Sequence, residues 1–481
     1  MRSRAALAAL LIALASPIPA HVGSPDVFYE GDAGPYRLLV TIRPPQVIPG
    51  TAEIEIRSLS SDVRQIRMVP LRITTAKQFA PVPDLARPSP EEPQFYTGSL
   101  WLMATGSWQV RLMAEGARGQ GTLSVPVPAL ATRVLGMQKA MGILLGVLGL
   151  LLCGGLVSIA GASVRDAPLE PGVRPDRTRR TRSVAVMAAT ALLLAAVLYF
   201  GNEWWSSEEG AYRRLVFKPL QLNARLDGSR LVLRLEDPGW LSRRTDDLLP
   251  DHDHLMHLYV IRLPEMDCVL HLHPERGEGD EFDQQLPDMP AGRYALYGDI
   301  VHANGLGETA TGEIALPAMK GRPLTGDDAA ADAPPLSKAD YNRSVTALSG
   351  GGRMLWERGS APLRAGEPCM FRFRVEDAGG QPVHDMQLYM GMLGHAAFVS
   401  ADRSAFAHVH PSGSVPMAAL QLTQPANPHA GHSMMDMDSG ALPATVSFPY
   451  GFPKPGAYRI FVQVKHGGKI ETGVFDTHLE N

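Results

Sequence analysis

Cysteine is nearly absent from this chain, which has three cysteines among 481 residues. Cys153, Cys268 and Cys369 lie far apart, so neither a disulfide framework nor a CxxC zinc site can be read from them. Strong charge of one sign is also missing, since the formal net charge is −4. The composition therefore provides no basic surface for nucleic acid, which we exclude as a partner. The length is typical of about three domains.

Histidine is missing from most of the N-terminal part of the chain. His21 is the one histidine before residue 202, and the others of the 15 all follow it. Histidines that served only as scattered surface or core residues would not segregate in this way. We therefore expect the functional site to lie in the C-terminal part of the chain.

Residues 1–20 have the features of a secretory signal peptide. Arg2 and Arg4 precede the apolar run Ala5–Ala15, and Ser-Pro-Ile-Pro-Ala follows. This pattern predicts cleavage after Ala20, with an uncleaved anchor as the alternative. The apolar run is short for a membrane span, which favours the signal peptide.

Two uncharged stretches, Met141–Val164 and Ser183–Gly201, are long enough to cross a bilayer. The loop 165–182 between them contains six arginines, so the positive-inside rule places it in the cytoplasm. Residues 21–133 and 202–481 then both lie outside the cytoplasm. The prediction is a protein of the inner cell membrane with periplasmic N- and C-terminal domains.

Short alternating strands separated by turns predict a mainly β protein with three immunoglobulin-like sandwich domains and a two-helix transmembrane hairpin. In residues 213–318, leucines alternate on both sides of Asp227-Gly228, which is typical of a hairpin. The polar, Pro- and Ala-rich stretch 319–343 is predicted to be a linker. The predicted domains are 21–133, 213–318 and 344–481, the last interrupted by an insertion near 412–442.

The second and third domains look like copies of one unit. Each has a His, then an HxHP motif 14 or 13 residues later, then Gly-x-Tyr, and a last His 10 residues after that Gly. The two predicted sets of metal ligands are His257, His271, His273 and His302 in one copy, and His395, His408, His410 and His466 in the other.

The HxH spacing has a physical meaning on a strand, because residues i and i+2 point to the same face. Two such imidazoles with one or two from neighbouring strands suit Cu(II), Zn(II) or Ni(II). Two alternatives remain open. An HxH can be the solvated face of a strand, and the repeated His and Tyr can form hydrogen-bonded corners of the fold.

Two further segments can add ligands. In Asp251-His-Asp-His-Leu-Met-His257 these are His252, His254 or Met256, unless the segment is an acidic metal-collecting loop or a solvated turn. The insertion combines imidazoles and thioethers, which favours copper over zinc because soft sulfur selects Cu(I). Its candidate ligands are His429, His432, Met434, Met435 and Met437.

His21 becomes the mature N-terminus if cleavage follows Ala20. An amine and imidazole on one residue can chelate copper, which resembles the N-terminal histidine of CopC-like copper-resistance proteins and of copper-dependent polysaccharide monooxygenases. Both families use a second histidine in the same domain, whereas residues 22–133 contain none. The match is therefore incomplete.

The segments 391–411 (GMLGHAAFVSADRSAFAHVHP) and 452–473 (FPKPGAYRIFVQVKHGGKIETG) resemble an exported bacterial β-sandwich module of copper- and heavy-metal-handling proteins. Residues 100–127 (LWLMATGSWQVRLMAEGARGQGTLSVPV) resemble YtkA-like and FixH-like domains. The resemblance implies an immunoglobulin-like fold and a role in metal homeostasis, and no particular reaction.

The leading functional prediction is a membrane-anchored extracytoplasmic copper-binding protein that captures, buffers or delivers the metal to a metal-accepting partner protein. An assembly scaffold and a copper-dependent oxidoreductase are the alternatives. No HExxH, Ser-His-Asp or paired-carboxylate signature supports an enzyme. Transport is disfavoured because the two uncharged helices offer no polar pathway.

Overall fold

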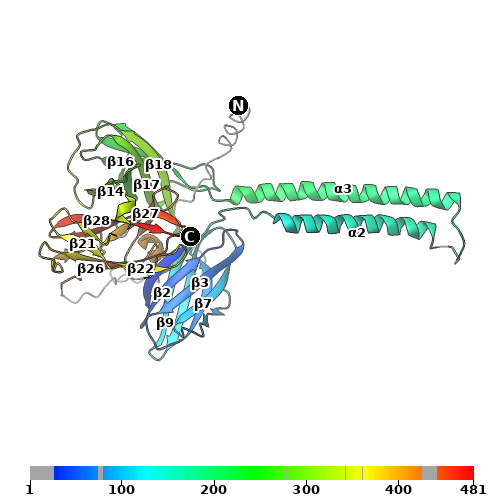
Figure 1. The fold of residues 1–481 in the computed structure, drawn as a ribbon, viewed down its shortest axis with the longest axis horizontal. Coiled ribbons are helices and arrows are strands. Elements are labelled where there is room, and N and C mark those ends of the chain that lie inside the picture. Colours follow the sequence, from blue (N-terminus) through cyan, green and yellow to red (C-terminus); the bar gives the residue numbers. More distant parts are fainter. Residues whose placement is uncertain are drawn as a thin grey trace. The chain divides into compact units, whose positions relative to one another are not determined.

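The computed structural model describes residues 26–73, 80–167, 169–170, 172–277, 279–341, 343–359, 361–424 and 441–480. The chain divides into two compact units. One consists of the residues up to Thr132 together with those from Phe217 onward, and the other is Arg133–Val216. The first unit is mainly β and the second is helical (Figure 1). The predicted mixture of β domains and two apolar helices is thereby confirmed at this coarse level.

The N-terminal β region (residues 26–132) contains two antiparallel sheets, ordered β1-β2-β3-β7-β6 and β5-β4-β8-β9. Alternate residues of β2 and β3, such as Leu38, Val40, Ile54 and Ile56, are fully buried, as a half-exposed sheet requires. The strands are β1 (Val27–Ala33), β2 (Tyr36–Arg43), β3 (Gly50–Ser58), β4 (Val63–Arg72), β5 (Asp84–Leu85), β6 (Arg87–Pro88), β7 (Phe95–Leu102), β8 (Gly106–Gly116) and β9 (Gly119–Ala129).

In the middle β region (residues 217–341) the strands join into one ten-stranded sheet, ordered β15-β16-β11-β10-β18-β17-β13-β14-β19, with β12 on β17. The predicted hairpin at Asp227-Gly228 is confirmed, since β10 and β11 pair across it. The strands are β10 (Gln221–Asp227), β11 (Arg230–Glu236), β12 (Leu248–Leu249), β13 (His257–Leu263), β14 (Cys268–Leu272), β15 (Glu275–Arg276), β16 (Glu281–Gln285), β17 (Gly292–His302), β18 (Gly307–Leu316) and β19 (Ala329–Asp332).

The segment predicted as a linker is partly structured. Its residues Ala329–Asp332 form β19, which pairs with β14 next to the first HxH motif. The composition suggested a linker because Ala, Asp and Pro have low strand propensity, but an edge strand needs only backbone hydrogen bonds to its neighbour. The middle β region therefore extends beyond residue 318.

The C-terminal β region (residues 343–480) has two sheets, ordered β20-β21-β22-β26 and β23-β27-β24-β25, with β28 on β27. Phe371 and Phe373 of the first sheet share a core with Phe398 and Ile460 of the second. The elements are β20 (Val345–Ala347), β21 (Arg353–Trp356), β22 (Cys369–Glu376), β23 (Met386–Gln387), β24 (His395–Ser400), β25 (Phe406–Val409), α4 (Met417–Thr423), β26 (Thr445–Tyr450), β27 (Gly456–His466) and β28 (Lys469–Leu479); the short 3-10 helix η2 (Lys338–Asp340) precedes this region.

The middle and C-terminal β regions pack against each other through a shared apolar cluster. Tyr259 and Tyr297 of the middle region meet Phe406 of the C-terminal region, with Tyr297 and Phe406 stacked at 4.3 Å between ring centroids. Arg459 is also buried here, paired with Asp476 and donating to the carbonyl oxygen of Met266. This contact brings β13 and β14 opposite β24 and β25, the strands that begin or end at the repeated histidines.

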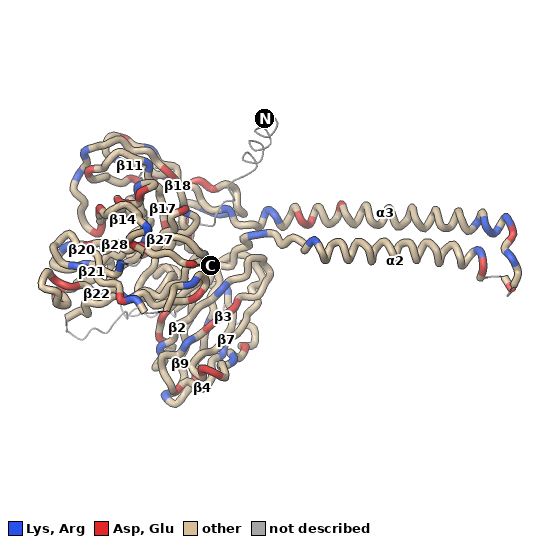
Figure 2. Tube along the Cα trace, viewed as in Figure 1, with Lys and Arg blue, Asp and Glu red and all other residues tan. Residues whose placement is uncertain are grey.

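The second unit is a pair of long helices, α2 (Lys139–Arg165) and α3 (Arg177–Leu215). They run side by side (Figure 1), and the Ser183 hydroxyl donates to the Gly161 carbonyl oxygen at 2.8 Å. Both are long and apolar enough to cross a membrane. Charged residues gather toward the ends of the helices (Figure 2). Helix α3 continues beyond Gly201, where the predicted span ends.

Candidate metal centre

Eight histidines from both copies of the repeat meet in one cluster. Rings of the two regions approach closely: His257 and His408 lie 5.2 Å apart between centroids, and His252 and His395 lie 5.3 Å apart. The sequence predicted one ligand set in each domain, whereas the structure brings members of both sets together. We call this group the histidine cluster; it consists of His252, His254, His257, His271, His273, His395, His408 and His410.

The local fold explains how the repeat delivers these rings. His257 and His395 are the first residues of β13 and β24, and each follows a tight turn closed by an isolated bridge. The HxH motifs fall at the ends of the neighbouring strands: His271 and His408 lie in β14 and β25, and His273 and His410 follow directly after these strands. Because side chains two apart share a face, the two histidines of each motif project into the cluster together.

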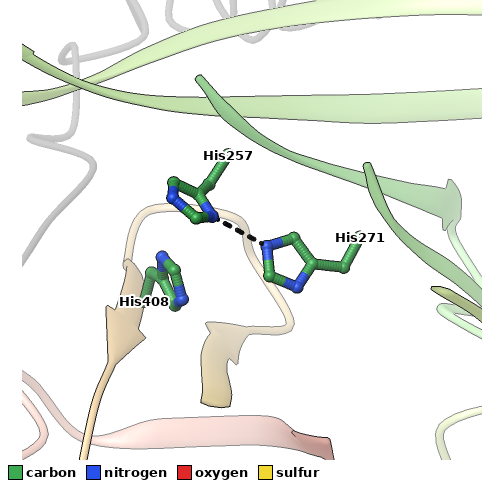
Figure 3. Close-up of side chains that lie close together, drawn as sticks. All are labelled: His257, His271 and His408. Atoms are coloured by element: carbon green, nitrogen blue, oxygen red, sulfur yellow. Dashed lines mark hydrogen bonds between the residues drawn. The ribbon is translucent and has the colours of Figure 1, made fainter. Parts of the chain in front are cut away.

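The hydrogen bonds around His257 and His271 determine which ring nitrogen carries the proton. Nε2 of His257 lies 3.0 Å from the Asp251 carbonyl oxygen, which can only accept, so Nδ1 holds a lone pair. Nδ1 of His271 donates to Oε1 of Gln463 at 2.8 Å, which leaves the lone pair on Nε2. These two lone pairs face each other at 3.3 Å (Figure 3).

The second copy repeats this arrangement. Nε2 of His395 lies 3.2 Å from the Tyr389 carbonyl oxygen, so its Nδ1 is unprotonated. Nδ1 of His408 lies 3.4 Å from a carboxylate oxygen of Asp299. With the ring proton on that side, Nε2 carries the lone pair, and it lies 3.1 Å from Nδ1 of His395. Two lone pairs this close repel unless one cation binds both, and both separations suit two metal–nitrogen bonds meeting at roughly 100–110°.

The supporting partners cross between the regions. Gln463 of β27 pairs with His395 in the sheet but supports His271 of the middle region. Asp299 of β17 pairs with His257 but faces His408 of the C-terminal region. Each is steadied by a threonine on the next strand: Thr309 donates to Asp299 at 2.5 Å, and Gln463 donates to Thr472 at 3.4 Å. Such partners orient metal-binding imidazoles and fix their tautomers.

Three more rings present a nitrogen that has no hydrogen-bond partner among the described residues. Nε2 is buried and unpaired in His252, His273 and His410. The other nitrogen of His273 contacts Asp328 at 3.0 Å, and that of His410 lies 3.4 Å from the Val415 carbonyl oxygen. Buried polar atoms normally have partners, so these unpaired nitrogens indicate a missing ligand. His252 and His410 also belong to one group whose ligand atoms lie close together.

Burial keeps these imidazoles in the form that binds metal. Desolvation, aided by repulsion between neighbouring rings, lowers the pKa of His257, His271, His395 and His408 well below its usual value. It lowers the pKa of His410 to about 3. A neutral ring has a lone pair to donate and needs no proton release when metal binds.

Two acidic side chains lie beside the rings: Asp251 is buried, and Asp299 is half-buried. Desolvation raises the pKa of both, that of Asp299 to about 7. Asp251 accepts a hydrogen bond from the Ala418 backbone N–H at 2.7 Å, which ties α4 to the cluster. A bound cation would favour their ionised form and offset the cost of burying them.

Three groups of side chains have ligand atoms close enough for one metal ion. The groups overlap, because His408 belongs to two of them and His410 to two, so the ions they could hold would be neighbours. The groups are His257, His271 and His408; His395, His408 and His410; and Asp251, His252 and His410. Figure 3 shows the first, with His408 entering from the C-terminal region.

Two predicted ligands lie in other hydrogen-bonded pairs. Nδ1 of His302 contacts Asp247 at 2.9 Å, and Nε2 of His466 contacts Glu471 at 2.8 Å. Both come three residues after the positions that support the cluster, Asp299 and Gln463, and three residues along a strand is a shift of roughly 10 Å. The predictions for His21, His429, His432, Met434, Met435 and Met437 fall outside the described residues.

Asp299 and Gln463 are the functional positions that the sequence analysis missed. They occupy equivalent places, each seven residues after the Gly that begins the Gly-x-Tyr strand. Alignment of the two copies therefore places these residues at the same position, but the match was not recognised because one copy has Asp and the other has Gln. The shared property of these residues is a side-chain oxygen that accepts from an imidazole.

Comparison with known proteins adds little. Residues 350–481 match a family described as a domain of unknown function, DUF8832. No curated protein matches. Among solved structures, a biofilm-associated protein BSP domain aligns over 100% of this chain and 70% of its own, with 7% identity and a TM-score of 0.15. Latent PorU from Porphyromonas gingivalis aligns over 95% and 34%, with 7% identity and a TM-score of 0.14, so this chain spans about a third of it. Neither likeness bears on fold or function.

Proposed function

We propose that this protein holds copper in one centre with several metal ions, built jointly by the middle and C-terminal β regions. The observation that carries the proposal is the close approach of ring nitrogens in two pairs, at 3.3 Å between His257 and His271 and at 3.1 Å between His395 and His408. Hydrogen bonds on the far side of the first three rings, and the Asp299 carboxylate beside His408, favour tautomers that leave these nitrogens unprotonated. A metal ion relieves the repulsion and uses the geometry already present.

Copper is the first candidate and zinc the alternative. The cluster is rich in neutral imidazole, which suits both metals, and Cu(II) binds nitrogen ligands more tightly than Zn(II) does. The predicted Met- and His-containing segment near 429–437 adds sulfur, which favours Cu(I). Because the rings are almost fully buried, we expect metal that exchanges slowly, as in storage or a resident centre.

The setting that we propose is extracytoplasmic. Two helices fit a membrane hairpin, and the arginine-rich turn between them fits the cytoplasmic side. Both β parts of the chain then face the same outer compartment, where the protein captures or buffers copper, or delivers it to a metal-accepting partner protein. The immunoglobulin-like and YtkA-like or FixH-like character of the domains belongs to this proposal.

The direct test is metal stoichiometry of the full-length protein in detergent, titrated separately with Cu(I), Cu(II) and Zn(II). We expect at least two tightly bound copper equivalents per chain, and weaker binding of zinc. His384→Ala, which changes an exposed histidine outside the cluster, should leave the count unchanged. Absence of tight binding of every metal would contradict the proposal and favour the scaffold function.

A second prediction concerns the crossed support by Gln463. Gln463→Leu removes the acceptor that holds Nδ1 of His271, so copper affinity should fall by about 10–100-fold, as is typical for such partners. Gln463→Glu retains an acceptor oxygen and should restore most of the affinity. Equal loss in both variants, measured by competition with a chelator, would show that Gln463 acts through packing and not through His271.

A further inference from the structure

A cavity of about 390 Å³ opens beside the histidine cluster. One end is formed by His257, His408 and His410 together with Asp251 and Asp299. The walls come from all three β regions and are mostly apolar, with Pro44, Pro126, Ile300, Val301, Phe406 and Ala419 among them. Imidazoles of the candidate metal groups thus border a partly open cavity whose walls come from all three β regions.

The chemistry of the lining restricts what can bind. Among the described residues, no lysine or arginine lines the cavity and four acidic residues do, so an anion is disfavoured. Two of these acids have cationic partners outside the lining: Glu308 binds Arg243 at 2.8 Å, and Asp26 lies 3.7 Å from Arg43. The remaining two, Asp251 and Asp299, lie at the histidine end.

The histidine end offers hydrogen-bond acceptors rather than donors. Asp299 has carboxylate oxygens, and Nδ1 of the lining residue His410 lies against the Val415 carbonyl oxygen, which leaves a lone pair on its buried Nε2, a nitrogen without a partner among the described residues. A ligand that fits must therefore bring a donor group to this end and an apolar body to the walls. An apolar cavity of about 150 Å³ already admits benzene, so this volume has room for a ring with substituents.

We propose that the cavity binds a small neutral phenol, with its ring between the apolar walls and its hydroxyl group at the histidine end. The O–H donates to a carboxylate or a free ring nitrogen, and the phenol oxygen is then beside the metal. This proposal extends the proposed function. It rests on that function only in placing the phenol oxygen beside a metal ion. Binding in the cavity itself needs no metal.

The test is calorimetric titration of full-length protein, metal-free and loaded with redox-inactive Zn(II), using phenol, toluene and benzoate as probes. We expect phenol to bind at least tenfold more tightly than toluene, which lacks the donor, and than benzoate, which is anionic. Equal binding of phenol and toluene, or no binding of either, overturns the inference. Metal binding without phenol binding overturns this inference alone, whereas phenol binding without metal binding contradicts the proposed function.

Variants locate the site. Ala419→Phe and Val301→Phe fill the cavity from different β regions and should each lower phenol affinity at least tenfold while the metal count is unchanged. Leu422→Phe is the matched control, since Leu422 lies on the same helix as Ala419 but outside the lining. If one filling variant fails to fold, the other decides. Filling variants that slow metal loading while phenol still binds would identify a path for the metal instead and overturn the proposal.

Discussion

His408→Asn is expected to lower the copper affinity of the whole centre by at least 100-fold and to reduce the number of bound ions by more than one. His408 belongs to two of the three candidate groups, one of which contains two histidines of the middle β region. Replacing a residue that binds the metal directly should lower the metal affinity by at least as much as replacing a residue that only supports a ligand, for which 10–100-fold is typical. Equilibrium competition with a chelator, with metal counting, measures both quantities.

The matched control is His466→Asn, a histidine of the same region that pairs with Glu471 instead of joining the cluster. Its copper count should remain that of the unchanged protein. If His408→Asn removed only the metal associated with the C-terminal region and left a full-affinity site on His257 and His271, the two copies would hold metal independently. One shared centre would then be wrong.

The repeat in the sequence was sufficient to predict six of the eight histidines in the cluster as two sets of ligands, because strand alternation is a local rule. His252 and His254 were identified as auxiliary ligands from their neighbourhood alone. Long apolar runs likewise predicted both helices of the second unit. These features depend on residues close to one another in the chain.

The joining of the two sets into one centre could not be predicted in this way. It depends on how the sheet containing Tyr259 packs on the sheet containing Phe406, a contact between residues 147 positions apart that no periodicity encodes. The supporting roles of Asp299 and Gln463 depend on the same packing, because each acts on a ring of the opposite region. His302 and His466 were predicted as ligands because a repeated histidine is easier to recognise than a repeated acceptor oxygen.

The metal-free protein is expected to lose its native tertiary structure when the pH falls from 6.5 toward 5. Burial lowers the pKa of seven cluster histidines below the value of about 6.5 that they regain on unfolding, so the unfolded chain binds more protons in this range. Their contribution to stability is complete above pH 6.5 and falls by up to about 1.4 kcal/mol per histidine for each pH unit below it. A domain stability of about 5–15 kcal/mol cannot withstand several such losses.

Two carboxylates act in the opposite direction. Burial raises the pKa of Asp251, and raises that of Asp299 to about 7, so the folded state takes up their protons first and gains stability as the pH falls. Seven histidines outweigh two carboxylates, and the net effect is acid lability.

Near-ultraviolet circular dichroism and thermal melting between pH 7.5 and 5 measure this loss of tertiary structure. Bound metal should shift the transition to lower pH because it binds only the neutral rings of the folded state. His410→Gln removes one of the histidines and should reduce proton uptake on unfolding by about one. A metal-free protein as stable at pH 5 as at pH 7.5 would mean that the rings are not held buried and neutral together, and the geometry that supports the metal centre would fail with it.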